Sequence, residues 1–381
     1  MSRTPLSGSV LALLCASAAC AHQKAPTFVA LASGGRFTCA RTADGRLFCW
    51  GWNGDGELGN GSTDPSTLPR AVRTDVRFRF HTLGNRHVCA LDSVGSAYCW
   101  GSNPAGQLGI RSADVKPHAV PTRVETALHF RSLAAGANHT CGLADDGVLY
   151  CWGDNDEGQL GTGDTISRDI PTPVVGGLTF ASVNINEGDD ATCGLTADGD
   201  TYCWGDGVRG AGADPSAWTT DYGRCKNYCI AKPVRLPART RITFTTLAAP
   251  YCGLHEGIAY CWNTKPDGFQ VPEPISSSLH FSSLAAGGAH YCGLTADSVA
   301  YCWSTDEYRE FGVAPTTPGW QVEPSRVPGI GRVALVAPGG SHICALTVSG
   351  EAYCWGRNRD GQLGTGTGDS ASTPVRVAGR S

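Results

Sequence analysis

The residues of this chain with the clearest capacity for chemistry are its cysteines, which recur in pairs. Eighteen cysteines occur in 381 residues. Fourteen of them belong to seven copies of a phrase close to Cys-Ala/Gly-Leu-x-x-Asp-Gly-x-x-Tyr-Cys-Trp. Thiols at a fixed spacing either oxidise to disulfides or bind a metal such as zinc. The pairs are Cys39 with Cys49, Cys89 with Cys99, Cys141 with Cys151, Cys193 with Cys203, Cys252 with Cys261, Cys292 with Cys302, and Cys344 with Cys354.

The spacing within the pairs favours disulfides over metal sites. Residues that face each other across an antiparallel hairpin have positions with a constant sum, so Cys39 and Cys49 are opposite each other if the chain turns at Asp44-Gly45. In the fifth copy Cys252 and Cys261 are nine residues apart, which suits a two-residue turn. Zinc ribbons prefer Cys-x2-Cys knuckles, and the sequence has none. We therefore predict one disulfide within each copy.

Four cysteines lie outside the copies. Cys225 and Cys229 are close together in an insertion, and we predict that they form a small disulfide there. Cys15 and Cys20 belong to the N-terminal end of the chain. Residues 1–19 have the pattern of a secretory signal peptide, with an apolar stretch too short to span a bilayer as a stable anchor.

The end of this segment, Ser17-Ala18-Ala19-Cys20, resembles the lipobox of bacterial lipoproteins, whose cysteine becomes the lipidated first residue. Cleavage before Cys20 removes Cys15, and lipidation occupies Cys20, so sixteen of the eighteen cysteines remain to pair. Cleavage after Ala21 also leaves sixteen, so ordinary secretion stays open. We expect an exported protein, either an outer-membrane or cell-surface lipoprotein whose only membrane contact is its lipid, or a periplasmic or secreted one.

Each copy also carries the turns of a small antiparallel sheet. In the third copy, a turn near Gly136 and an Asp146-Gly147 turn separate three short apolar runs, and a glycine-rich loop leads to a further strand at Pro171–Val175. The 50 glycines and 22 prolines of the chain supply such turns. Four strands in a unit repeated at about 40 to 60 residues indicate a propeller blade, and hence an all-β fold.

The run Tyr353–Gly366, followed by Pro374-Val375, resembles the repeat of the regulator of chromosome condensation (RCC1) family. The resemblance implies a seven-bladed β-propeller, which we place at residues 27–379, behind a signal peptide (1–19) and a short tether (20–26). The same pattern occurs in three further segments, Gly51–Gly59, Gly101–Gly109 and Gly153–Gly161.

We expect the ring of blades to close through its last strand. Thr373–Val377 has no later copy to join, so we predict that this strand pairs with the first blade near Phe28–Ala32. Such a pairing would leave no exposed sheet edge at the junction.

No other group of residues predicts catalysis. His87, His139, His290 and His342 each lie two residues before the first cysteine of their copy, but three copies lack this histidine. A ring of metal ligands would therefore be broken, and we expect structural hydrogen bonds instead. No Ser-His-Asp order, activated cysteine or pair of catalytic acids stands out. We expect no enzyme activity, no cofactor and no metal.

The pattern of charges and aromatic residues predicts the kind of partner. The net charge is −4 and no run of lysine or arginine occurs, which argues against nucleic acid. We expect a monomer that binds a protein, or as a second option a carbohydrate. Copies four to six depart from the regular Gly-Gln-Leu-Gly loop, and aromatic loop residues make large contacts at low entropic cost. The alternative is that these residues only cover blade edges. The predicted contact residues are Trp218, Tyr222, Tyr228, Tyr308, Phe311 and Trp320.

Three functions are compatible with these features. The first is a non-enzymatic exported scaffold that binds a macromolecular partner through the loops of blades four to six. The second is a secreted enzyme inhibitor resembling β-lactamase inhibitory protein II. The family name implies a third, guanine-nucleotide exchange on a small GTPase. An export signal and disulfides argue against this third function, because GTPases and chromatin are found in reducing compartments.

Overall fold

The structure is a computed structural model of the whole chain. It describes residues 26–110, 115–185, 188, 190–206, 230–236, 242–248, 252–261, 272–288, 290–304 and 323–379. The described residues contain strands, turns and loops but no helix. Accordingly, they include no helix that is long and apolar enough to cross a membrane.

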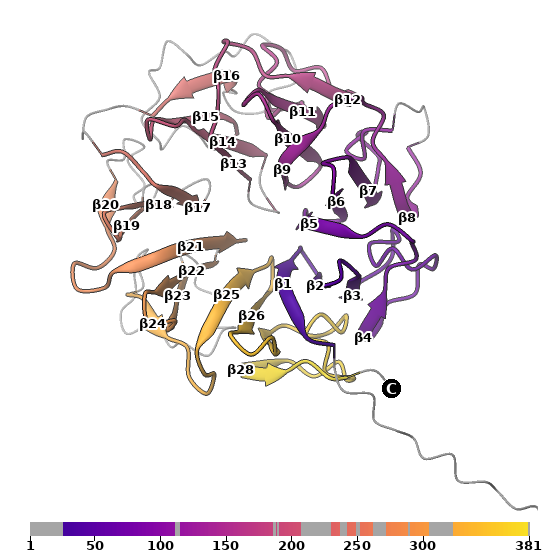
Figure 1. Cartoon of the computed structure of the whole chain (residues 1–381), viewed down its shortest axis with the longest axis vertical. Coiled ribbons are helices and arrows are strands. Elements are labelled where there is room, and N and C mark those ends of the chain that lie inside the picture. Colours follow the sequence, from indigo (N-terminus) through magenta and orange to yellow (C-terminus); the bar gives the residue numbers. More distant parts are fainter. Residues whose placement is uncertain are drawn as a thin grey trace, which may run out of the picture.

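The strands form seven four-stranded antiparallel sheets around a common axis, which confirms the predicted seven-bladed β-propeller (Figure 1). Each blade consists of four consecutive strands that run from the axis to the rim. The innermost strands are β1 (Phe28–Ser33), β5 (Phe78–Leu83), β9 (Phe130–Ala135), β13 (Ser182–Asn184), β17 (Thr246–Ala248), β21 (Phe281–Gly287) and β25 (Val333–Pro338). The second strands are β2 (Phe37–Thr42), β6 (His87–Asp92), β10 (His139–Ala144), β14 (Ala191–Leu195), β18 (Cys252–His255), β22 (His290–Thr295) and β26 (His342–Thr347).

The two remaining strands of each blade carry the chain outward. The third strands are β3 (Leu47–Gly51), β7 (Ala97–Gly101), β11 (Leu149–Gly153), β15 (Thr201–Gly205), β19 (Ile258–Cys261), β23 (Ala300–Ser304) and β27 (Ala352–Gly356). The outer strands are β4 (Ser66–Ala71), β8 (His118–Arg123), β12 (Arg168–Pro173), β16 (Ile230–Arg235), β20 (Glu273–Pro274), β24 (Ser325–Arg326) and β28 (Ala371–Arg376).

The repeated cysteines face each other across the second and third strands, at the register that their spacing predicts. In each blade the two opposed cysteines are joined as a disulfide, and none of these seven bonds connects two blades. The bonded pairs are Cys39 with Cys49, Cys89 with Cys99, Cys141 with Cys151, Cys193 with Cys203, Cys252 with Cys261, Cys292 with Cys302, and Cys344 with Cys354.

The fifth blade keeps its disulfide although its cysteines are nine residues apart instead of ten. Glu256 and Gly257, in the turn between the two strands, both have positive φ (49° and 82°), as the predicted two-residue turn requires. The shorter turn therefore preserves the opposed positions of the two cysteines. The eighth predicted pair, Cys225 with Cys229, lies outside the described residues.

The core of the molecule lies between neighbouring blades. In most blades a phenylalanine of the innermost strand packs on the tryptophan that follows the second cysteine, as Phe130 does on Trp152 with ring centres 5.9 Å apart. The edges of Trp50, Trp100, Trp152 and Trp204 reach a glycine of the preceding blade. A Cβ on Gly59, for example, would lie 2.6 Å from Trp100 Nε1, and Gly59 has a φ of +62°. The loop must therefore have glycine there, both for its φ and for the close approach.

The ring does not close in the predicted way. β28 pairs only with β27, and β1 pairs only with β2, so the prediction that Thr373–Val377 joins the first blade was wrong. The reason is that every blade is complete after four consecutive strands, which places β28 at the rim of blade seven and β1 beside the axis in blade one. Side chains close the ring instead. Phe28, Trp50 and Val377 share one buried cluster, and the Phe28 N–H donates to Gly350 O at 3.1 Å.

The direction of the strands gives the propeller two different faces. One face, which we call the loop face, holds the inner loops between first and second strands and the outer loops between third and fourth strands. The described inner loops include residues 34–36, 84–86, 136–138 and 339–341, and the described outer loops include residues 52–65, 154–167 and 357–370. The opposite hairpin face holds the tight turns between second and third strands. Because β1 starts beside Gly350, in the tight turn of blade seven, the chain enters the propeller from the hairpin face.

Candidate interaction face

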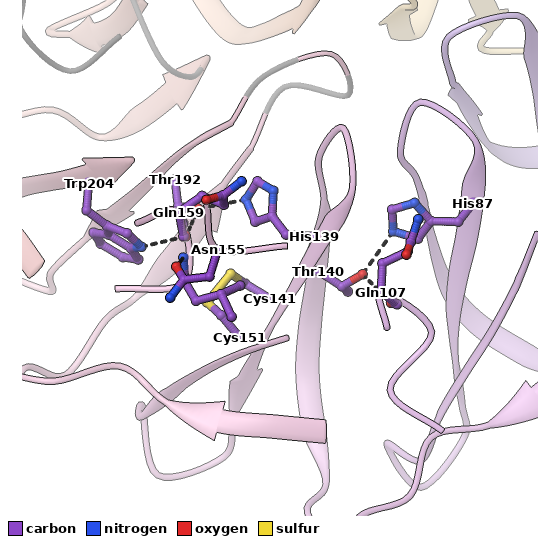
Figure 2. The surroundings of a disulfide bond; sticks show 11 residues. His87, Gln107, His139, Thr140, Cys141, Cys151, Asn155, Gln159, Thr192 and Trp204 are labelled. Carbon is purple, nitrogen blue, oxygen red and sulfur yellow. Dashed lines mark hydrogen bonds between the residues drawn. A yellow bond between two sulfur atoms is a disulfide. The ribbon is translucent and has the colours of Figure 1, made fainter. Parts of the chain in front are cut away.

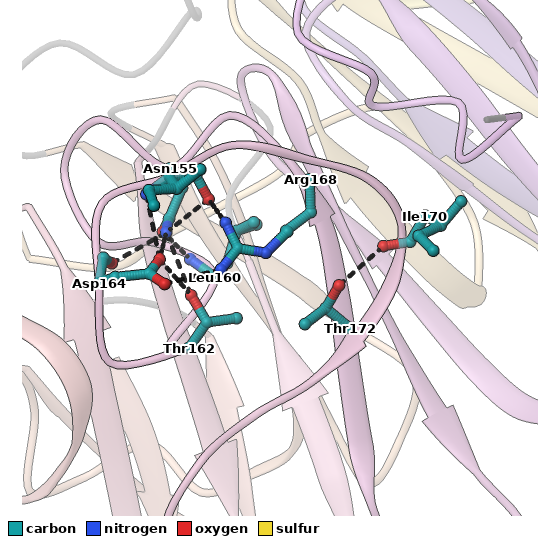
Figure 3. A network of polar contacts seen from close by, with 8 residues as sticks. Asn155, Leu160, Thr162, Asp164, Arg168, Ile170 and Thr172 are labelled. Atoms are coloured by element: carbon teal, nitrogen blue, oxygen red, sulfur yellow. Dashed lines mark hydrogen bonds and ion pairs between the residues drawn. The ribbon is translucent and has the colours of Figure 1, made fainter. Parts of the chain in front are cut away.

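The regular outer loops of the loop face are held by a buried asparagine three residues after the tryptophan. Asn155 accepts a hydrogen bond from the Leu160 N–H at 2.9 Å, and its amide donates to the carbonyl oxygens of Asp164 and Ile166 at 2.9 and 3.1 Å (Figure 3). Its side chain is fully buried. One side chain therefore fixes both halves of the loop.

The same asparagine occurs in blades one, two and seven, as Asn53, Asn103 and Asn358, and each accepts a hydrogen bond from the leucine N–H five residues on. Sequence reasoning missed this role, although the recurrence of asparagine three residues after tryptophan was a usable signal. Blades four to six have Gly207, Lys265 and Asp306 at that position. These blades therefore lack the side chain that fixes a regular outer loop.

A second element joins the outer loop of one blade to the next blade. The backbone carbonyl of Gln107, in blade two, accepts hydrogen bonds from Trp152 Nε1 and Thr140 Oγ1 of blade three, both at 2.9 Å. The backbone carbonyl of Gln159 accepts the same two hydrogen bonds from Trp204 and Thr192 of blade four (Figure 2). Gln362 of blade seven receives Trp50 and Thr38 of blade one, which joins the two ends of the ring.

The histidines complete this connection. His87 Nε2 lies 2.9 Å from Thr140 Oγ1 in the next blade. The single hydroxyl proton of Thr140 is donated to the Gln107 carbonyl, so the histidine must donate its Nε2–H and carry no proton on Nδ1. Burial lowers the pKa of His87 to about 4, which keeps the ring neutral at physiological pH. The expected structural hydrogen bond is thus observed for His87, and His139 and His342 have equivalent contacts.

At the boundary between blades one and two both partners of this contact are replaced together. Phe37 of blade one occupies the position that His87 has in blade two. Val88 of blade two occupies the position that Thr140 has in blade three. Both side chains are fully buried in one hydrophobic cluster. A polar pair has therefore been exchanged for an apolar pair, which leaves no buried polar group without a partner.

Blade one also has a carboxyl where the regular outer loops carry glutamine. Glu57 Oε2 accepts the Asp55 N–H at 2.8 Å, as the Gln107 side chain accepts the Ala105 N–H at 3.0 Å. The other side-chain atom differs: Gln107 Nε2 points toward Asn138 Oδ1 at 3.5 Å, whereas Glu57 Oε1 is buried without a hydrogen-bond partner among the described residues. Burial raises the pKa of Glu57 to about 7.

Charged side chains of the loop face form ion pairs between neighbouring blades. Near blades seven, one and two, Arg36 binds Asp360 through Nε and Nη2 at 2.8 Å, and Arg86 Nη2 lies 2.6 Å from Asp55. Each pair links two neighbouring blades.

Near blades three and four, the carboxylates of Asp154 and Asp206 lie close enough to Asp190 to affect its charge. Burial raises the pKa of the Asp190 carboxyl, and the carboxylates of Asp154 and Asp206 raise it further. Beside these residues, an open groove of about 590 Å³ lies between blades two and three, and its lining combines Asp154, Asp156 and Asp169 with Arg168.

The aromatic contact residues predicted from the sequence lie outside the described residues, as do Cys20 and the signal segment. The described ends of the two segments that carry these aromatics are nevertheless informative. One segment follows Asp206 and ends at Ile230, and the other follows Ser304, so both start from third strands on the loop face. No group of three or more His, Cys, Asp or Glu side chains in the described part of the chain is arranged to hold a metal ion.

A propeller with blades of this kind defines a class of repeat protein, and the sequence identifies the family. The regulator of chromosome condensation (RCC1) repeat matches residues 44–91, 94–143, 146–195 and 349–381, and a second form of that repeat matches residues 28–57, 130–159 and 333–362. The chain belongs to the RCC1 repeat family.

Individual relatives share the repeat at low identity. The human regulator of chromosome condensation is 26% identical over 286 residues, which cover 68% of this chain and 68% of that protein. The human E3 ubiquitin-protein ligase HERC2 is 26% identical over 283 residues, which are 68% of this chain but only 6% of HERC2. The solved structure of Prp20p from Saccharomyces cerevisiae has a TM-score of 0.53 at 21% identity, covering 92% of this chain and 76% of Prp20p. That likeness shows the shared fold.

The histidine–threonine contact gives a first prediction. Replacing Thr140 with valine should lower the free energy of unfolding by about 1–3 kcal/mol, because the His87 Nε2–H loses its acceptor in a buried site. The double variant H87F/T140V copies Phe37 and Val88 and should cost less than the sum of the two single changes. Urea denaturation of the oxidised protein measures all three variants. Additive losses would show that the two side chains are not coupled.

The buried carboxyl of Glu57 gives a second prediction. In the folded protein the pKa of Glu57 is about 7, above the ordinary value of 4.5. Between these two values the folded state binds one proton more than the unfolded state, so the free energy of unfolding falls as the pH rises toward about 7. E57Q removes this loss, so it should stabilise the protein by about 2 kcal/mol more at pH 8 than at pH 5. The reciprocal variant Q107E should acquire a pH dependence of the same sign. Equal pH profiles for E57Q and the natural protein, from urea denaturation, would contradict the assignment.

Proposed function

We propose that this chain is a non-enzymatic exported scaffold that binds a macromolecular partner, most directly another protein, through the loop face. The observation that carries the proposal is the difference between the blades. In blades one, two, three and seven, the buried asparagine and the loop carbonyl fix the outer loops to the propeller. The sequence of blades four to six abandons this pattern, so their outer loops are released from that structural role.

The residues of the released loops suit a contact surface. The two segments that start from β15 and β23 contain Trp218, Tyr222, Tyr228, Tyr308, Phe311 and Trp320. Large aromatic side chains contribute most to protein interfaces. Protein binding is also a property of a relative, because Prp20p has described binding properties to Gsp1p and histones. We carry over only the general role of a binding propeller, since seven disulfides do not suit the reducing compartments of those partners.

Export to an oxidising compartment is the second part of the proposal. The signal-like segment at 1–19 and the seven disulfides within blades both support it. If Cys20 carries a lipid, C20S should move the protein from the membrane fraction to the soluble fraction of a fractionated cell. C15S, which changes a cysteine of the signal segment itself, is the control and should leave the distribution unchanged. Retention of C20S in the membrane fraction would contradict a lipid anchor at this residue.

Capture of a partner tests the binding function. The mature oxidised protein, immobilised and incubated with periplasmic or culture-medium proteins, should retain a specific partner, and W218A/W320A should retain less without a change in thermal midpoint. A soluble hydrolase among the captured proteins, together with loss of its activity, would favour the inhibitor function instead. Equal capture by both forms would exclude these aromatic residues as the contact site.

A further inference from the structure

Two joints of the ring, where the outer loop of one blade meets the inner loop of the next, carry an arginine and an aspartate at the same positions. Between blades seven and one, Arg36 donates two hydrogen bonds of 2.8 Å to the Asp360 carboxylate. Between blades one and two, Arg86 Nη2 lies 2.6 Å from Asp55 Oδ2, but this oxygen is buried without an aligned hydrogen bond from any described residue. Arg86 is therefore fixed less firmly than Arg36.

The residue two positions after the aspartate differs between these joints. In the joint of blades seven and one it is Gln362, which accepts the Asp360 N–H at 3.0 Å and donates from Nε2 to Ser341 Oγ at 3.4 Å. In the joint of blades one and two it is Glu57, whose Oε2 accepts the Asp55 N–H while Oε1 has no partner among the described residues. An ionised carboxylate would leave this buried oxygen without a donor, which costs free energy.

The charged groups around Glu57 come from both sides of the joint. Burial has the largest effect on its pKa and raises it, the Asp55 carboxylate raises it further, and the Arg86 guanidinium lowers it. Arg36, in the inner loop of the same blade, is already bound in the preceding joint. His118, on the neighbouring strand β8, contacts a threonine of its own strand. Arg86 is 50% exposed and is the cation best placed to turn toward Glu57.

We propose that Glu57, Asp55 and Arg86 form a proton-operated switch, in which Arg86 binds Asp55 while Glu57 is protonated and turns to Glu57 when this residue releases its proton to water. Two carboxylates compete for one guanidinium, and the more deeply buried one gains more from the ion pair once it is ionised. Arg86 belongs to an inner loop and Glu57 to an outer loop of the loop face, so the switch changes the arrangement of that face. It does not depend on the proposed binding function.

Two tryptophans report on the two joints. Trp100 Nε1 donates to the backbone carbonyl of Glu57, and Trp50 Nε1 donates to that of Gln362, both at 2.9 Å. In ¹H–¹⁵N NMR spectra of the oxidised protein, the Trp100 indole signal should shift with a midpoint near pH 7. The Trp50 signal should stay constant over the same range and serves as the control. The variants W100F and W50F each remove one signal and so assign the two.

Variants that copy other joints test each member of the switch. E57Q copies Gln362 and should abolish the titration of the Trp100 signal, whereas Q362E should make the Trp50 signal titrate. D55A copies Ala105 of blade two and should lower the midpoint of the Trp100 titration. R86N copies Asn138 of blade three and should raise it, each by at least about half a pH unit. A variant that unfolds is recognised because it loses the Trp50 signal as well.

Double-mutant cycles measured by urea denaturation test the change of partner. The coupling between R86N and D55A should be present at about pH 5 and decrease at about pH 9, whereas the coupling between R86N and E57Q should appear only at the higher pH. A Trp100 signal that does not titrate, or that titrates unchanged in E57Q, overturns the proposal. Couplings that are equal at the two pH values overturn it too, because Arg86 then keeps one partner. Capture of a binding partner is unaffected by either result.

Discussion

In the part of the chain that the structure describes, the joints from blade seven through blade one to blade four depend on one backbone carbonyl in each regular outer loop. The carbonyl of Gln107, Gln159 or Gln362 accepts two hydrogen bonds from the next blade, one from a tryptophan and one from a threonine. This carbonyl can reach its donors only if the loop is held in place, which the buried asparagine does, and if glycine allows the close approach of the tryptophan ring. The repeated sequence phrase thus serves mainly to join neighbouring blades.

Much of this arrangement could be predicted from the sequence, and the predictions that failed did so for physical reasons. The hairpin register could be predicted because the two faces of a strand alternate, so a turn and a pair of cysteines determine which residues are opposite. The closure of the ring could not be derived from the number of copies. It depends on which strand of a blade comes first in the chain. The strand that begins at Phe28 is the innermost strand of blade one and not the outer strand of another blade. The role of Asn155 was missed although the asparagine recurs in four copies, because the recurrence alone does not show which backbone atoms it holds.

Some features of the candidate contact surface could likewise be predicted from the sequence, and others could not. The aromatic residues of blades four to six could be singled out because their loops break the repeat, but their geometry lies outside the described residues. Exposure likewise could not be derived from the repeat: Trp52 is partly exposed, whereas Trp50, two residues earlier in the same copy, is fully buried. A repeat protein reveals its individual function at positions where one copy differs from its sisters without any structural need.

The seven disulfides each join cysteines nine or ten residues apart, and none of them connects two blades. In order along the chain, every repeated cysteine is therefore bonded to its neighbour within the same copy. If the protein is exported as proposed, a chain that emerges from a translocation channel with its N-terminal end first can oxidise each pair before the next pair appears. The native pattern would then be the first one available, and it would need no later exchange of partners. The same fourteen thiols, released together from a fully reduced chain, would face a large number of wrong pairings, so the order of emergence would direct the covalent structure.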